Sequence, residues 1–434
     1  MFESKWIDKL DRNLFPFVEY PGYDQRYPAH TGMGLSKETI DTIRNTSEQL
    51  FKIFSKAVKI SQQGDTTFFT NMEIPEKLWP YLNIPNAFNQ PTFLSRFDFV
   101  LDKDMNIKMV EINADTPCAI IESYYGNEVY CTENNKKNVN EGEMDNLANF
   151  LMEIYKRGFY PTVDFMSGDF IAARPFVFSC FDDYIEDYGT TKFLILTMQE
   201  ACDKDSMCKV ENSIGFESFY NLKVDKNTGD ILLPNGDCAG ALYRLHPLEI
   251  LIDEESDDGY PIGTKLLDGY KNNKFLMFNP PEAILMQSKA FQSLIWNLAF
   301  TDKFYTEREE DIIKRYLPPS YFSKDEIPRN MKYVEKPIWG REGLDIKIMQ
   351  NNNIIFEKEV EDPGEVVRRL SKNKMYQQYI DQPKFNIRTD EGSLSGYITL
   401  SCFMLFDKAS ALYARFSEDP IAGTEAYWVP LYVK

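Results

Sequence analysis

FLSRFDFVLDKDMNIKMVEIN, residues 93–113, is the stretch that decides the fold. Two runs in which apolar residues recur at alternate positions flank the polar turn DKDMN, and this pattern predicts a β-hairpin. Side chains alternate between the two faces of a strand, so Arg96 and Asp98 share one face. Glu111 and Asn113 share a face of the next strand. Pairing across the hairpin can therefore bring Asp98, Glu111 and Asn113 into one cluster.

Two carboxylates and an amide oxygen are hard ligands, suitable for Mg²⁺ held against the phosphates of a nucleotide. The hairpin therefore predicts a metal site formed by Asp98, Glu111 and Asn113. The alternative is a solvated hairpin face that carries ordinary surface charges. The spacing of these residues leaves both interpretations open.

A second segment whose residues could take part in binding or catalysis is EKPIWGREG, residues 335–343. A strand that ends at Lys336 runs into a loop flanked by Gly340 and Gly343 and containing Arg341. Glycines let backbone N–H groups approach phosphate oxygens, and the two cationic side chains can neutralise them. The segment is not a Walker A loop, and a β-turn with solvated charges is the alternative.

Three further segments each allow a functional and a structural interpretation. Lys289 lies at the start of a predicted helix, where it could reach a phosphate. The extended segment YQQYI, residues 376–380, can present backbone groups to the edge of an adenine ring. Arg415 lies on a predicted strand and could equally be a surface or interface arginine. His30 and His246 are interpreted as structural.

Length and charge limit the classes of function. A chain of 434 residues suggests two or three domains, or one large composite fold. The net charge of −19 and the pI of about 4.7 argue against nucleic acid and membrane surfaces as partners, because an acidic surface repels both. Cationic substrates such as polyamines would fit this charge, although solubility alone also accounts for it. No apolar run approaches the ~18 residues that a membrane-spanning helix needs.

Cysteine and histidine usage narrows the chemistry further. Seven cysteines occur without a CxxC pair or zinc-type spacing, which predicts reduced thiols and a cytoplasmic location. The charged N-terminus MFESKWIDKLDRN lacks the apolar segment of a signal peptide. Only two histidines are present, which excludes a multi-histidine metal site and argues against a Ser-His-Asp triad. The chemistry is expected to rest on carboxylates, lysines, arginines and backbone groups.

Hydrophobic periodicity and turn residues predict the other elements. Helices are expected at residues 36–62, 72–82, 143–156, about 287–300 and 307–316. Short buried strands are expected at 192–198 and 239–245, a hairpin with its loop at 221–238, and a surface linker at 253–263. The last hundred residues should be rich in strands: YVEKPI, LDIKIM, IIFEKEV, YQQYI, YITLSCFMLF and SALYARF.

Taken together and in order, these segments resemble the synthetase domain of the glutathionylspermidine synthases and their stand-alone relatives. RFDF and VEINAD resemble that family's Arg-x-Asp-Phe and Tyr-Glu-Tyr-Asn-Ala-Asp segments, and EKPIWGREG resembles its Lys-Pro-Ile-x-Gly-Arg-x-Gly loop. MQSKAFQSLIW, YQQYIDQPKF and ALYARF…VPLYVK are similar to its Asn-Lys-Ala helix start, its Tyr-Gln-Gln hinge segment and its closing strand and tail. The resemblance spans nearly the whole chain.

The resemblance implies an α+β class protein with a permuted ATP-grasp fold and an associated pre-ATP-grasp-like α/β domain. In a permuted fold the metal carboxylates precede the phosphate lysines in sequence. The expected division is an N-terminal part with the metal-binding hairpin at 1–165, an inserted pre-ATP-grasp-like domain at 166–260, and the nucleotide-binding part at 261–434.

The resemblance also implies roles for individual residues. Two Mg²⁺ ions would bind Asp98, Glu111 and Asn113, and the ATP phosphates would bind Lys289, Lys336, Gly340 and Gly343. The adenine would lie beside Gln378 and Tyr379, and the transferred phosphoryl group would face Arg96 and Arg341. Arg415 would form the closing wall of the active site, and the acyl substrate would lie beside Thr116 and Cys118.

The implied reaction joins a carboxylate to an amine. ATP phosphorylates the carboxylate of a peptide or amino acid, and an amine, polyamines included, attacks the acyl phosphate. Thr116-Pro117-Cys118 stands where the family has Ser-x-Ser, so glutathione is not the expected acyl substrate. The alternatives are a catalytically silent ATP-binding or scaffold protein, and a ligase for another peptide or amino-acid pair. The sequence leaves a homo-oligomer open.

Overall fold

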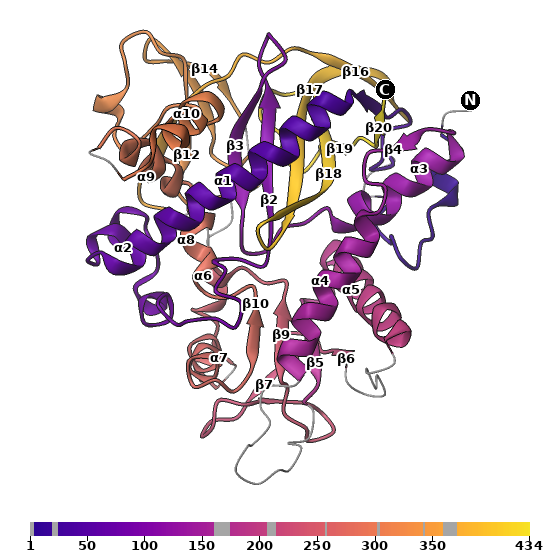
Figure 1. Ribbon diagram of the computed structural model, residues 1–434, viewed down its shortest axis with the longest axis vertical. Coiled ribbons are helices and arrows are strands. Elements are labelled where there is room, and N and C mark those ends of the chain that lie inside the picture. The colour runs from indigo at the N-terminus through magenta and orange to yellow at the C-terminus, as the bar shows by residue number, and fades with distance from the viewer. Residues whose placement is uncertain are drawn as a thin grey trace.

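The predicted hairpin forms and lies within a six-stranded antiparallel sheet (Figure 1). In its register Arg96 is opposite Asn113 and Asp98 is opposite Glu111. The strands of this sheet are β2 (Leu94–Leu101), β3 (Ile107–Asn113), β16 (Phe385–Thr389), β17 (Gly392–Leu405), β18 (Lys408–Ser417) and β19 (Tyr427–Trp428). The hairpin thus pairs with strands from the C-terminal end of the chain.

The computed structural model describes the greater part of the chain. The described residues are 4–19, 25–159, 174–205, 214–256, 258–301, 304–341, 343–358 and 371–434.

One long helix, α1 (Lys37–Gln63), crosses one face of the six-stranded sheet (Figure 1). Ser36 caps it by accepting a hydrogen bond from the backbone N–H of Thr39, as the sequence predicts. The apolar stripe of α1 is buried, and the ring of Phe54 lies 5.6 Å from that of Phe97 in β2. Because side chains alternate along β2, the apolar residues that face α1 leave the charged residues on the opposite face.

A five-stranded sheet faces that charged side. Its strands are β11 (Ser320–Tyr321), β12 (Tyr333–Pro337), β13 (Lys347–Gln350), β14 (Asn353–Glu357) and β15 (Lys374–Gln378). The strands predicted near the C-terminus therefore form and divide between two sheets, although residues 359–360 of the predicted strand IIFEKEV lie outside the described residues. The nearby helices are α8 (Ala283–Gln287), α9 (Ala290–Leu298) and α10 (Glu307–Tyr316). The helix predicted at about 287–300 is confirmed as α9, and it begins at Ala290 because the chain is extended at Ser288, directly after α8.

A parallel four-stranded sheet forms the lower part of the molecule in Figure 1. Its strands are β5 (Phe176–Ser179), β6 (Ile214–Phe216), β9 (Ala241–Arg244) and β10 (Leu276–Phe278). The helices beside it are α4 (Glu143–Phe159), α5 (Ile185–Lys204) and α7 (Ile262–Lys271).

The strand predicted at 192–198 is wrong, because this segment lies inside α5. A short apolar run does not by itself distinguish a buried strand from a buried helix. Four of its buried positions, Phe193, Leu194, Thr197 and Met198, recur with helical spacing. The helix predicted at 72–82 is instead a 3₁₀ helix, η2 (Glu76–Tyr81), with Pro80 inside it.

The remaining elements are short. They are β1 (Met33–Leu35), β4 (Lys137–Asn138) and β20 (Leu431–Val433) in one sheet; the hairpin β7 (Lys223–Val224) and β8 (Ile231–Leu232); the helices α2 (Thr67–Asn71), α3 (Asn127–Glu133) and α6 (Leu248–Leu251); the 3₁₀ helices η1 (Ile7–Lys9) and η4 (Lys324–Glu326); and the π-helical η3 (Glu122–Gly126).

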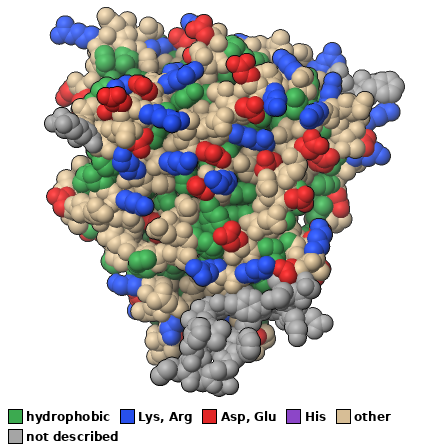
Figure 2. Space-filling model, viewed as in Figure 1, with side chains coloured by type: hydrophobic (Ala, Val, Ile, Leu, Met, Phe, Trp, Pro, Cys, Tyr) green, Lys and Arg blue, Asp and Glu red, His purple; other side chains and the backbone are tan. Residues whose placement is uncertain are grey.

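Charges of both signs are interspersed over the face shown in Figure 2, with no extended basic area on it. Among the described residues, no helix has the length and apolar character needed to cross a membrane.

Candidate active site

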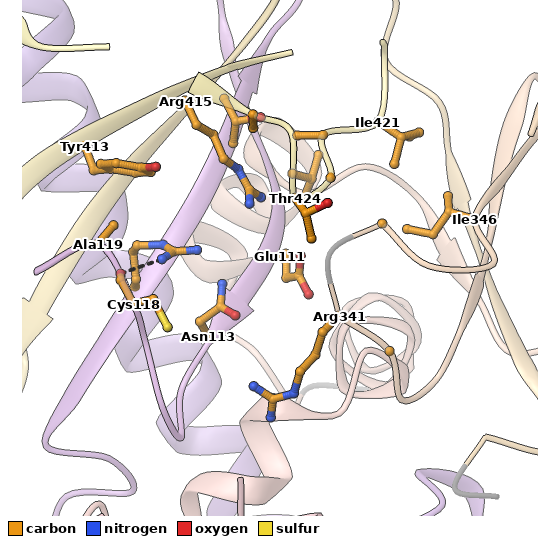
Figure 3. A pocket seen from close by; sticks show the side chains of 18 of the residues that line it. Glu111, Asn113, Cys118, Ala119, Arg341, Ile346, Tyr413, Arg415, Ile421 and Thr424 are labelled. Carbon is orange, nitrogen blue, oxygen red and sulfur yellow. Dashed lines mark hydrogen bonds between the residues drawn. The ribbon is translucent and has the colours of Figure 1, made fainter. Parts of the chain in front are cut away.

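A cavity of about 620 Å³ lies between the six-stranded and five-stranded sheets (Figure 3). Almost all the residues predicted for the site line it: Arg96, Glu111, Asn113, Thr116, Cys118, Lys336, Gly340, Arg341, Gly343, Gln378, Tyr379 and Arg415. Asp98 and Lys289 do not line it, and each instead bonds to lining residues from behind. The fold thus gathers residues as far apart in the chain as Arg96 and Arg415.

Asp98 is the centre of a buried ionic cluster under the cavity floor. Its two carboxylate oxygens accept hydrogen bonds from Arg96 Nε and Nη2 at 2.7 and 2.9 Å. Arg415 Nη2 lies 3.5 Å and Asn113 Nδ2 3.3 Å from Asp98 Oδ2. Burial alone would lower the pKa of Arg96, but the charge of Asp98 outweighs burial and raises it. Asp98 therefore orients two arginines and the Asn113 amide, which donates through its nitrogen.

Glu111 carries a carboxylate between two lysines. Lys289 Nζ lies 2.9 Å from Glu111 Oε1. Burial would raise the pKa of Glu111, but the charges of Lys289, Lys336 and Arg415 outweigh burial and lower it to about 2. Glu111 is therefore ionised, and it neutralises cationic groups that would otherwise face each other.

Lys336 is the buried cation at the end of β12. Its Nζ donates to the carbonyl of Val110 at 3.2 Å and to Gln377 Oε1 at 2.8 Å. Burial, together with the charge of Lys289, lowers the pKa of Lys336 to about 8 despite the attraction of Glu111. A buried ammonium held by neutral acceptors is well placed to bind an anion.

The loop after β12 is anchored on both sides of the cavity. Lys289 Nζ donates to the carbonyl of Gly340 at 2.5 Å. Arg341 Nη2 binds Glu249 at 2.7 Å, and its Nη1 lies 3.4 Å from Thr116 Oγ1. Gly343 has φ of +73°, and a Cβ there would lie 2.8 Å from the carbonyl oxygen of Ala422, so this position needs glycine.

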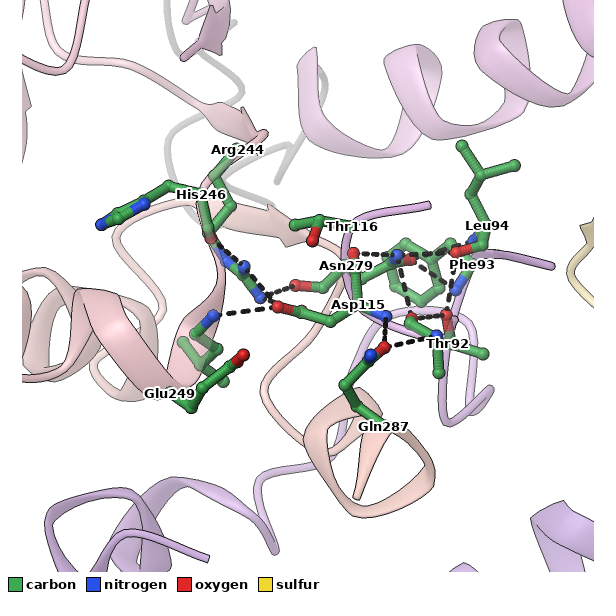
Figure 4. A network of polar contacts seen from close by, with 12 residues as sticks. Thr92, Phe93, Leu94, Asp115, Thr116, Arg244, His246, Glu249, Asn279 and Gln287 are labelled. Carbon is green, nitrogen blue, oxygen red and sulfur yellow. Dashed lines mark hydrogen bonds and ion pairs between the residues drawn. The ribbon is translucent and has the colours of Figure 1, made fainter. Parts of the chain in front are cut away.

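The segment that follows the hairpin is held rigidly from below (Figure 4). Asp115 and Arg244 form a fully buried ion pair, with Nη1–Oδ2 at 3.0 Å. The backbone N–H of Leu248 also donates to Asp115, and Gln287 Oε1 accepts from the backbone of Ala114. Both carboxylate oxygens of Asp115 and both terminal nitrogens of Arg244 thereby have partners, whereas Arg244 Nε has none among the described residues.

These contacts fix the segment that contains Thr116 and Cys118. Arg96 Nη1 donates to the carbonyl of Cys118 at 2.7 Å. Burial raises the pKa of the Cys118 thiol well above its usual value, and the charges of Asp187 and Glu186 add to the increase. Cys118 is therefore a neutral thiol at the cavity wall, not a thiolate nucleophile.

The end of β15 presents a backbone edge to the cavity. Gln378 donates its N–H to the carbonyl of Pro319 at 2.8 Å, and Tyr379 donates to that of Lys332 at 2.9 Å. Pro319 has no N–H and cannot return a hydrogen bond to the Gln378 carbonyl. The Gln378 carbonyl consequently receives no hydrogen bond from Pro319 at the end of β15, and a planar amino-bearing ring could bind it there.

The donor set around the hairpin suits one kind of metal. Among the described residues, no group of three or more His, Cys, Asp or Glu side chains could hold an ion by itself. Mg²⁺ is commonly bound by one or two carboxylates together with substrate phosphates and water. Glu111 and the Asn113 oxygen fit that pattern at the cavity surface, with Asp98 behind them. The site thus fits Mg²⁺ bound with a nucleotide better than a resident transition metal.

Two sets of residues at the site were missed by the sequence analysis. Arg244 holds the 115–118 segment through Asp115, and Glu249 holds Arg341. The position of Arg244 at the end of a buried apolar strand is the sequence feature that could have identified it. Glu186 and Asp187, at the start of α5, line the acidic end of the cavity. They were missed because part of α5 was assigned to a strand. His30 and His246 do not line the cavity.

Comparisons with known proteins identify the family of this chain. The model of the family described as "Glutathionylspermidine synthase preATP-grasp" matches residues 2–434. A Haemophilus influenzae protein named "Putative acid–amine ligase" is 23% identical over 402 residues, which is 91% of this chain and 87% of that protein. The bifunctional glutathionylspermidine synthetase/amidase of Escherichia coli is 22% identical over 372 residues, covering 82% of this chain. The match spans only 54% of that longer enzyme.

A solved structure shares the fold. A glutathione synthetase-like effector from Globodera pallida, in its apo form, superposes with a TM-score of 0.59 and 11% identity, covering 94% of this chain and 90% of the effector. The mixed α/β architecture of the two chains is therefore alike. Because the family model matches nearly every residue, the chain belongs to the glutathionylspermidine synthase family.

Proposed function

We propose that this protein joins a carboxylate to an amine through an acyl phosphate formed from ATP. Membership of the family makes the chain an ATP-dependent carbon–nitrogen ligase. The acyl-phosphate reaction is supported by a single cavity that has a cationic side, the oxygen donors Glu111 and Asn113 on its surface, and an acidic end. The order of the segments, with the hairpin before Lys336, supports a permuted ATP-grasp arrangement. The proposed parts remain residues 1–165, 166–260 and 261–434.

The nucleotide would lie along the five-stranded sheet. The Gln378 carbonyl at the edge of β15 would accept from the adenine amino group, with Tyr379 beside the ring. Lys336 and the backbone between Gly340 and Gly343 would bind the phosphates, with Lys289 behind them. Charge-assisted contacts of this kind are stronger than neutral hydrogen bonds.

Mg²⁺ would be held by Glu111 and Asn113, with Asp98 as a further ligand that also orients Arg96. When bound, the ions would neutralise phosphate charge, as in other phosphoryl transfers. Two ions are proposed, and these three side chains would hold them. In the described structure Glu111 bonds to Lys289, so a metal would compete with that ion pair.

The acyl substrate would bind between Arg96, Arg341 and the Thr116–Cys118 segment. One carboxylate oxygen attacks the γ-phosphorus of ATP, and the bond to the β–γ bridging oxygen breaks to release ADP. The arginines stabilise the charge that spreads over the transferring group. Arg415 Nε, which is buried and has no hydrogen-bond partner, supports this role because an anion would satisfy it.

The amine would enter from the acidic end, where Glu186 and Asp187 line the cavity. These carboxylates would attract a cationic amine such as a polyamine. The nitrogen attacks the acyl carbon, and the bond from that carbon to the phosphate oxygen breaks. The products are an amide, ADP and inorganic phosphate.

A phosphate-release screen of carboxylates against amines, with ATP and Mg²⁺, tests the proposal. A ligase should release phosphate above background only when both partners are present. A silent scaffold would bind ATP yet release none with any pair, and that result would reject catalysis.

The identity of the acyl substrate is a finer proposal. Thr116 keeps one hydroxyl at a place where the family has serine, Pro117 removes a backbone donor, and Cys118 offers only a weak donor. A site built to hydrogen-bond one substrate rejects another that cannot satisfy it. We expect glutathione with spermidine to be a poor pair. A kcat/KM at or above ~10⁴ M⁻¹s⁻¹ for this pair would overturn that expectation.

A further inference from the structure

Glu122 is a buried carboxyl group that the proposed reaction does not yet use. It begins the π-helical η3, and its residue is 0% exposed. Tyr27 Oη donates to Glu122 Oε1 at 2.9 Å, whereas Oε2 is buried without a hydrogen-bond partner. Short π-helical segments are frequent at functional sites.

Two tyrosines connect this carboxyl group to the cavity. The hydroxyl oxygens of Tyr27 and Tyr413 are 2.9 Å apart, and both tyrosines line the cavity although Glu122 does not. A continuous chain of hydrogen bonds therefore runs from the cavity wall to a carboxylate that solvent cannot reach.

Burial of the Glu122 carboxylate lowers the stability of the folded chain. Among the described residues Glu122 has no ion pair, and a buried carboxylate without one is costly. Burial raises its pKa to about 7, although the hydrogen bond from Tyr27 and the charge of Arg96 act in the opposite direction. The other ionisable groups of the cluster are Tyr413 and Arg415, which interact electrostatically with each other.

The outer end of the chain lies where the two substrates of the proposed reaction would meet. The guanidinium carbon of Arg96 lies 5.8 Å from the ring centre of Tyr413, and Arg96 also binds the carbonyl of Cys118. The charges of Asp187 and Glu186 act on the thiol of Cys118. Tyr413 thus borders the arginine proposed for the acyl group, and that arginine binds Cys118, on which the acidic end proposed for the amine acts.

We infer that Tyr413, Tyr27 and Glu122 form a proton relay that deprotonates the attacking ammonium group. The inference rests on the proposed function, because only an amine substrate has this proton to lose. An ammonium group has no lone pair for attack, so removal of one proton must precede formation of the amide bond.

The hydroxyl directions allow the transfer. Tyr27 donates to Glu122, so its oxygen can accept from Tyr413, and the Tyr413 oxygen can then accept from the ammonium N–H. The ammonium proton moves to Tyr413, the Tyr413 proton moves to Tyr27, and the Tyr27 proton moves to Glu122 Oε1. Both tyrosines end neutral, Glu122 ends as a carboxylic acid, and the nitrogen keeps its electron pair for attack.

The test separates the two halves of the reaction. Glu122→Gln keeps the size and a hydrogen-bond acceptor for Tyr27 but cannot take up a proton. Wild type and variant are compared with the best carboxylate from the phosphate-release screen and two nucleophiles. One is the amine found in the screen. The other is hydroxylamine, which is uncharged at neutral pH and yields a hydroxamate without prior deprotonation.

We expect Glu122→Gln to lower the amine-dependent rate roughly 10²- to 10⁴-fold, the usual contribution of a general base. The rate of hydroxamate formation should change less than about threefold. In wild type the amine-dependent rate should rise with pH through about 7, and this rise should vanish in the variant. Tyr27→Phe, which interrupts the chain of hydroxyls, should reproduce the effect.

Glu282→Gln is the matched control. Glu282 is also buried, also has an unpartnered Oε2, and has a pKa raised by burial to about 8, but its Oε1 accepts from Asn86, which does not line the cavity. Its variant should keep both rates and the wild-type pH profile.

Two results would overturn the relay. One is an unchanged amine-dependent rate and pH profile in Glu122→Gln, which would leave the deprotonation to Glu186, Asp187 or water. The other is an equal loss with both nucleophiles, which would indicate a structural role. Absence of hydroxamate in wild type would be a different failure, since it would reject the acyl phosphate and the relay with it.

Discussion

At the scale of single residues, the cavity is a set of charges that neutralise one another. Glu111 lies between Lys289 and Lys336, and Asp98 lies between Arg96 and Arg415. Cations therefore outnumber carboxylates around the region proposed for the phosphates, which is the balance expected of a site that binds a nucleotide with Mg²⁺.

Lys336→Met tests the phosphate role. It keeps most of the apolar volume and removes the charge, a contact typically worth about 1.5–3 kcal/mol. The affinity for Mg²⁺–ATP in calorimetry should fall about ten- to a hundredfold. Lys347→Met is the matched control, since Lys347 lies on the neighbouring strand β13, binds Glu357 and does not line the cavity. Equal affinities for the two variants would reject this role.

Glu111→Gln tests the metal role. The amide keeps the shape of the side chain but loses the charge that would bind Mg²⁺, so turnover should fall roughly a hundredfold or more, comparable to the loss of a key electrostatic group. Titration of Mg²⁺ at fixed ATP should show a higher metal requirement. Wild-type turnover with wild-type metal dependence would show that Glu111 is not a ligand.

At the scale of elements, local patterns predicted the hairpin and the C-terminal strands, because alternation and turn residues are encoded within a few positions. The same reasoning placed a strand at 192–198, where a short apolar run belongs to α5. The ion pair of Asp115 with Arg244 could not be predicted, because it joins residues 129 positions apart. Most of the predicted residues line the cavity and were found by motif, whereas the groups that hold them in place were not predicted.

Arg244→Met tests how that ion pair supports the segment after β3. Removing one partner of a fully buried pair leaves Asp115 charged without compensation, which typically costs about 3–5 kcal/mol. The free energy of unfolding in urea should fall by about this amount. Lys226→Met breaks the exposed pair with Asp258 and should cost no more than about 1 kcal/mol. Similar values for both variants would contradict the assigned importance of the buried pair.

At the scale of the whole molecule, stability should depend on buried carboxyl groups. Burial raises the pKa of Glu282 from 4.5 to about 8, despite its hydrogen bond from Asn86. The unfolded chain therefore releases this proton at lower pH than the folded chain, and folding loses stability as pH rises from 4.5 to 8. Glu282→Gln should remove this loss. Between pH 5 and pH 8 the free energy of unfolding of the variant, measured relative to that of wild type, should therefore increase by at most roughly 4 kcal/mol.

Urea unfolding of both proteins across this pH range measures the effect. A difference in stability that is constant with pH, or that shrinks toward pH 8, would show that Glu282 ionises normally in the folded chain.

The central claim is that the cavity transfers the γ-phosphoryl group of ATP to a carboxylate before an amine attacks. The most direct measurement follows oxygen from that carboxylate, labelled with ¹⁸O, during turnover of the active pair with ATP and Mg²⁺. An acyl phosphate passes one carboxylate oxygen to the phosphate that leaves, so mass spectrometry should find one ¹⁸O in the released inorganic phosphate, with ADP as the other product. Unlabelled phosphate, or release of AMP with pyrophosphate, would contradict the account.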